Sequence, residues 1–83
     1  MSAPFDADLS AAILGFNDEA VLYCRGISDV ATQEYARNYA RMLLNRAQGL
    51  EFSLPRIPQG LFEPNRRLIR STLERISDKY FQR

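Results

Sequence analysis

The sequence predicts a compact all-α domain of about four helices: two short N-terminal ones, a long central one and a C-terminal one. Apolar residues recur at helical spacing in the central and C-terminal parts of the chain. Capping residues and glycines separate the periodic segments. No proline or glycine interrupts the long central segment, residues 29–48. We expect residues 1–83 to form a single helical domain.

The first part of the chain predicts two short helices. Asp6 is suited to cap a helix over residues 7–14, and Gly15 is expected to end that helix. Asn17 is expected to cap a second helix over residues 18–25, whose acidic start complements the helix dipole.

Two longer helices follow. Ser28 is expected to cap the central helix, residues 29–48, and Gly49 to close it. The last helix is expected to open at Glu63 with Pro64 in its first turn, and to end near Phe81. Its apolar residues are spaced four, three and four apart and form one seam: Ile69, Leu73, Ile76 and Tyr80.

A proline-rich loop of about 14 residues is predicted between these two helices, a length that usually goes with packed side chains or a function. Residues 50–54 alternate apolar and polar side chains, but a single strand without a partner is unstable, so no sheet is predicted. The apolar side chains of the loop are expected to pack over the core as a lid: Phe52, Leu54, Ile57, Leu61 and Phe62.

The central segment repeats one triplet, Tyr-Ala-Arg, at residues 35–37 and 39–41. Positions four apart share one side of a helix. The helical wheel directs the alanines inward, where small side chains let the last helix approach closely. It directs the tyrosines to the border of that contact and Arg41 to the solvated side. The favoured interpretation is therefore a structural seam, and the alternative is a binding surface on the tyrosine–arginine flank.

The residue types argue against an enzyme. The chain has no histidine, the commonest general base and transition-metal ligand. Its one cysteine, Cys24, lies near a predicted helix C-terminus, where the dipole does not favour a thiolate, so it is interpreted as a small core residue. We expect no catalytic residue, no metal and no cofactor.

Charge is distributed unevenly around a net charge of +1. Residues 1–34 carry six acids and one arginine, and residues 35–83 carry ten bases and four acids. Arg66, Arg67 and Arg70 fall in the first two turns of the last helix, where cations oppose the dipole. We expect Arg66 and Arg70 to meet carboxylates of the acidic first third. The candidates are Asp6, Asp8, Asp18 and Glu19.

No apolar run reaches the ~18 residues that a membrane span needs. The first residues lack the basic start and apolar stretch of a secretory signal. The expectation is therefore a cytoplasmic protein without membrane contact.

These observations favour a small, non-enzymatic interaction protein: an adaptor, inhibitor or regulatory subunit. Arginine and tyrosine are enriched in interface hot spots, and the basic part of the chain suits an acidic protein partner. Because so small a chain gains stability from association, the last helix could also pair two copies in a homodimer. The predicted contact residues are Tyr35, Arg37, Arg41, Arg66, Arg67 and Arg70.

A nucleic-acid-binding regulator is the alternative. Residues 20–43 hold a short helix, a turn ending in Gly26-Ile27-Ser28 and a longer helix. This turn resembles that of helix-turn-helix regulators, whose second helix reads DNA. The first turn of the second helix, however, carries Asp29 and Glu34, and two acids facing phosphates would repel them. The protein-binding interpretation is therefore preferred.

Overall fold

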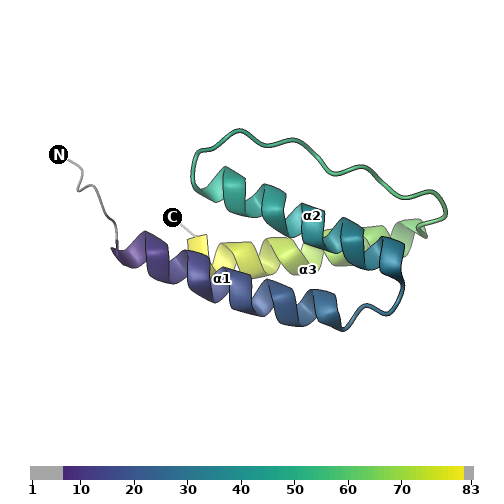
Figure 1. The fold of residues 1–83 in the computed structure, drawn as a ribbon, viewed down its shortest axis with the longest axis horizontal. Coiled ribbons are helices and arrows are strands. Elements are labelled where there is room, and N and C mark those ends of the chain that lie inside the picture. The colour runs from purple at the N-terminus through teal and green to yellow at the C-terminus, as the bar shows by residue number, and fades with distance from the viewer. Residues whose placement is uncertain (1–6, 82–83) are drawn as a thin grey trace.

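The computed structural model describes residues 7–81, which form three helices and no strand. The helices are α1 (Ala7–Arg25), α2 (Val30–Ala47) and α3 (Glu63–Phe81). α1 and α2 form an antiparallel hairpin, and α3 runs in the same direction as α2 (Figure 1). The all-α class is confirmed, but the expected count of four helices is wrong because α1 is continuous.

α1 passes through Gly15, which was expected to end it. A Cβ at this position would lie within 3.0 Å of three ring carbons of Tyr80 in α3. The glycine therefore lets α1 and α3 approach closely, at a helix-propensity cost of about 1 kcal/mol. Asn17 is an exposed residue inside α1 and caps no helix.

Asp29, and not Ser28, caps α2. The Asp29 carboxylate accepts a hydrogen bond from the backbone N–H of Thr32 at 2.9 Å, as an N-cap should. The Thr32 hydroxyl donates to the same oxygen at 2.5 Å. Both hydrogen bonds favour the ionised carboxylate, and they lower the pKa of Asp29.

Gly49 closes α2 as predicted. Its φ of +72° lies in the left-handed region that favours glycine. The Gly49 N–H donates to the carbonyl of Arg46 at 3.1 Å, and the Leu50 N–H donates to the carbonyl of Asn45 at 2.9 Å. This pair of bonds is the Schellman motif, which satisfies the last helical carbonyls.

The connection from α2 to α3 has to return along the whole of α2, because the two helices are parallel. The 18 residues of α2 are about 27 Å long at 1.5 Å each. Residues 48–62 make this return along α2 on its side away from α1 (Figure 1). The prediction of a lid over the core is therefore wrong for most of the loop. Leu61 packs against the core, whereas four apolar side chains stay at least half exposed: Phe52, Leu54, Ile57 and Phe62.

The core lies where the three helices meet. Its largest fully buried side chains are Phe16 from α1, Leu43 from α2 and Leu73 from α3. The apolar seam predicted for α3 is confirmed, with Ile69 and Leu73 buried and the rest partly buried against the core: Ile76 and Tyr80. The ring of Phe16 also contacts that of Phe81, with centroids 5.6 Å apart, which ties α1 to the end of α3.

The tyrosines of the repeated triplet lie inside this core. Tyr35 and Tyr39 are 3% and 6% exposed, whereas Ala40 is only partly buried. α2 packs against two helices, so its buried face is broad and takes in the tyrosine stripe. The expectation that tyrosines border the contact is therefore wrong. Ala36 is fully buried, as expected for the alanine stripe.

Candidate functional site

A groove of about 380 Å³ runs between α1 and α2, and we call it the arginine groove. Its apolar lining consists of Ala20, Val21, Cys24, Ala40 and Leu44. Its polar lining consists of Asn17, Arg25, Arg37 and Arg41. It combines a narrow apolar surface with three positive charges.

Small side chains explain why this groove forms. Ala20 and Cys24 are one turn apart on α1, and Ala40 lies opposite them on α2. Ala20 and Cys24 are buried, so the groove is lined at depth by side chains too short to fill it. Ala40 therefore borders α1, although the sequence predicted that this alanine would pack on α3.

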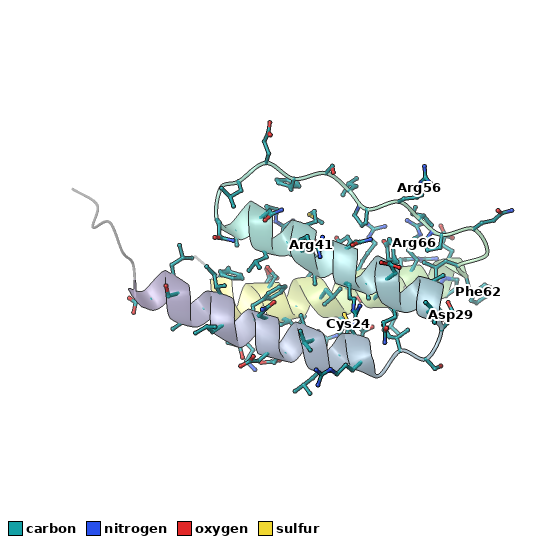
Figure 2. All side chains as sticks on the ribbon, viewed as in Figure 1. Cys24, Asp29, Arg41, Arg56, Phe62 and Arg66 are labelled. Carbon is teal, nitrogen blue, oxygen red and sulfur yellow. The ribbon has the colours of Figure 1, made fainter. Side chains whose placement is uncertain are left out.

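Cys24, which is labelled in Figure 2, is 3% exposed and so has the character of a core residue. Burial raises the pKa of its thiol, although the positive charge of Arg37 opposes this shift. The thiol is thus protonated near neutral pH, as expected of a structural cysteine.

The described residues supply no negative charge to the lining of the arginine groove. Among residues 7–81 no carboxylate lines it, and Arg25, Arg37 and Arg41 are all exposed. Among residues 7–81, none of the three makes an ion pair or a side-chain hydrogen bond. These guanidinium groups are therefore available to a negatively charged ligand.

The structure brings together only part of the predicted contact set. Arg37 and Arg41 share the arginine groove, but Tyr35 is buried and offers no surface. Arg25 joins the groove, and sequence reasoning missed it because the groove forms only where α1 packs beside α2. A helical wheel of the predicted helix 18–25 already places Arg25 beside Val21, but it does not show which residues of α2 face them.

Arg66 and Arg67, which were also predicted as contact residues, form ion pairs within their own helix. Arg66 contacts the Glu63 carboxylate at 3.1 Å and Arg67 contacts it at 3.5 Å. Arg70 makes no ion pair among the described residues, and its charge lies near the hydroxyls of Tyr35 and Tyr39. Glu63 in the first turn thus offsets the cations that oppose the α3 dipole.

We expected Arg66 to pair with a carboxylate of the acidic first third, but it pairs with Glu63, so that prediction is wrong. Glu19, one of the expected partners, pairs instead with residues at the end of α3. α1 and α3 are antiparallel, so the start of α1 lies beside the end of α3 (Figure 1). The Glu19 carboxylate accepts from Lys79 Nζ at 2.6 Å and from the hydroxyl of Tyr80. Of the other candidates, Asp6 lies outside the described residues.

Glu74 joins α2 to α3 beside the core. Its carboxylate accepts hydrogen bonds from the Tyr39 hydroxyl and from Arg46 Nη2, both at 2.9 Å. Burial alone would raise the pKa of Glu74, but the bonds from Arg46 and Tyr39 and the charge of Arg70 together lower it. This cluster explains why Tyr39 can be buried with a satisfied hydroxyl.

The turn between α1 and α2 does not have helix-turn-helix geometry, because the two helices lie alongside each other (Figure 1). The Gln33 side chain donates to the carbonyls of Cys24 and Ile27, both at 3.1 Å. The first turn of α2 is thereby occupied in closing the hairpin, and its cap is the acidic Asp29.

Compared with protein-family models, with curated proteins and with solved structures, the chain gives no match. Within residues 7–81, no cluster of three histidine, cysteine or acidic side chains could hold a metal ion. No helix in that part of the chain is both long and apolar enough to cross a membrane.

Proposed function

We propose that this chain is a small, non-enzymatic interaction protein that binds an acidic protein partner through the arginine groove. The observation that carries the proposal is the convergence of Arg25, Arg37 and Arg41 on one groove, to whose lining the described part of the chain contributes no carboxylate. Arginine is among the residues that contribute most to protein interfaces, because its flat guanidinium group binds carboxylates in pairs of hydrogen bonds.

The groove also suits a protein better than a small anion. Its apolar lining, with Val21 exposed at the edge and Leu44 partly buried, offers surface to apolar side chains. An amphipathic acidic helix would place its apolar side on this lining and its carboxylates on the arginines, which is the helix-in-groove mode of recognition.

The experiment is affinity capture from the cell in which the chain is native, with nuclease treatment. The test variant is Arg25→Gln/Arg37→Gln, in which two exposed arginines that make no ion pair within residues 7–81 become good helix formers, so the fold should persist. The matched control is Arg75→Gln, an exposed arginine of α3 that does not line the groove.

The expected result is one nuclease-resistant protein partner that the unmodified chain and Arg75→Gln retain and the double variant loses. Loss of capture after nuclease treatment would instead favour nucleic-acid binding, since phosphate contacts also require arginines. Equal capture by the double variant would exclude the arginine groove as the binding surface.

A further inference from the structure

The loop between α2 and α3 leaves part of its backbone unpaired. Among the described residues, no hydrogen bond involves the backbone of residues 51–57. The bonds that flank this stretch run from Leu50 N–H to the Asn45 carbonyl and from Leu61 N–H to the Pro58 carbonyl. Free N–H and C=O groups on a segment that runs alongside α2 (Figure 1) can pair with the backbone of an added strand.

This stretch forms one wall of a second groove, of about 580 Å³, which we call the loop groove. The loop wall is residues 51–56, and the opposite wall is the outer side of α2: Asn38, Arg41, Met42 and Asn45. Figure 2 shows Arg41 on α2 and Arg56 on the loop that passes over it. The volume falls within the range of about 300–1,000 Å³ that is typical of ligand sites.

The helix wall carries polar groups at the spacing of an extended peptide. The side-chain amides of Asn38 and Asn45 have no hydrogen-bond partner among residues 7–81. They are two turns apart on α2, which is about 10.5 Å. Three residues of a β-strand cover about 10 Å. Both amides can therefore reach the backbone of a single extended segment.

Charge and side chains define the chemistry of that segment. Arg41 and Arg56 line the loop groove and make no ion pair within the described residues, whereas Glu51 is its only acid there. Phe52 is 50% exposed and Leu54 is 77% exposed, so apolar surface is also open to a ligand. The groove thus suits a segment that carries acidic and apolar side chains.

We propose that the loop groove binds an extended, acidic peptide segment of a partner protein, which pairs with the backbone of residues 51–54 as an added strand. Pro55 and Pro58 limit the pairing to a short ladder, because proline has no N–H to donate. The asparagine amides hold the far edge of the peptide, and Arg41 and Arg56 bind its carboxylates. The site is separate from the arginine groove and shares only Arg41 with it.

The test uses the full chain as bait for a phage-displayed library of random seven-residue peptides. Enriched peptides should carry aspartate or glutamate together with apolar residues. The strongest is then synthesised, together with a version N-methylated at alternate residues, which keeps the side chains but removes strand-pairing donors. Titration by fluorescence polarisation should show at least a tenfold weaker binding of the N-methylated peptide.

Two matched variants distinguish binding in the loop groove from binding in the arginine groove. Arg56→Gln changes the loop groove alone and should weaken the peptide severalfold, whereas Arg37→Gln changes the arginine groove alone and should leave its affinity unchanged. Amide hydrogen exchange at residues 51–54 should slow when the peptide binds. The proposal is overturned if the library yields no enriched sequence, if N-methylation has no effect, or if Arg56→Gln binds normally. Peptide binding lost only in Arg37→Gln would place the ligand in the arginine groove and leave the proposed function standing.

Discussion

Gly15 sets the contact between α1 and α3 by lacking a single carbon atom. The ring of Tyr80 occupies the space that a Cβ would need, and the Tyr80 hydroxyl is held by Glu19 one turn further along α1. The ring cannot swing aside without losing that hydrogen bond. Gly15, which the local sequence predicted to end a helix, is therefore required for the packing of α1 against α3.

We predict that Gly15→Ala destabilises the protein by about 1–3 kcal/mol, because overpacking outweighs the helix propensity gained. Urea unfolding followed by circular dichroism measures the change. In a Tyr80→Ala background, where the ring is absent, the same substitution should be neutral or stabilising. Equal effects in both backgrounds would contradict a contact between these residues.

Glu74 gives the protein a pH-dependent stability. Its pKa is lower in the folded state than the unfolded value of about 4.3, so its contribution is present above that pH and is lost as pH falls through the folded pKa. We predict that Glu74→Gln costs about 1 kcal/mol or less at pH 7, since the ion pair with Arg46 is partly exposed.

The difference in stability between Glu74→Gln and the unmodified chain should shrink towards zero as pH falls through the lowered pKa of folded Glu74, because the native carboxyl group then becomes protonated too. Unfolding in urea at several pH values tests it. Glu51→Gln, at an exposed loop carboxylate without an ion pair among the described residues, should match the unmodified chain throughout. A constant difference for Glu74→Gln would show that the lost bonds do not depend on ionisation.

At the scale of elements, two neighbouring residues, Ser28 and Asp29, compete for the N-cap position of α2. Both Ser28 and Asp29 are good N-cap types, so local propensity does not choose between them. Asp29 takes the position, while the Gln33 side chain binds the carbonyls of Cys24 and Ile27 across the turn. The hairpin turn, and not the cap preference, selects where the helix begins.

We predict that Asp29→Ala costs about 1 kcal/mol of stability, within the usual range of about 0.5–2 for a lost N-cap. Ser28→Ala, at an exposed position without a side-chain hydrogen bond among the described residues, should change it by less than about 0.5 kcal/mol. Thermal unfolding of the two variants compares them directly. A larger loss from Ser28→Ala would reverse the assignment of the cap.

At the scale of the whole molecule, the parallel arrangement of α2 and α3 determines where the loop lies. A short turn would make neighbouring helices antiparallel, as it does for α1 and α2. The return of residues 48–62 instead takes them along the outer side of α2 (Figure 1), and of their large apolar side chains Leu61 packs against the core while Phe52, Leu54, Ile57 and Phe62 are exposed. The loop groove exists because residues 48–62 follow this path beside α2.

We predict that replacing Phe52, Leu54 and Ile57 together with serine lowers stability by less than about 1 kcal/mol, because these side chains are at least half exposed. Leu73→Ala, in the fully buried part of α3, should cost about 2–5 kcal/mol. Chemical unfolding distinguishes them. A loss of several kcal/mol from the loop variant would mean that the loop does cover the core.

The sequence by itself determined the all-α class, the bounds of α3 and, within one residue at each end, those of α2. These features depend on apolar spacing, on Pro64 and on Gly49, all of which act within a few residues of one another. Arg41 was likewise predicted as exposed from the helical wheel alone.

Only the tertiary structure decided the rest. The lack of room for a Cβ at position 15 depends on Tyr80, which is 65 positions from Gly15, and the partner of Glu19 depends on the antiparallel order of α1 and α3. The burial of Tyr35 follows from packing α2 against two helices at once. Each of these outcomes is set by contacts between distant parts of the chain, and local propensity carries no information about them.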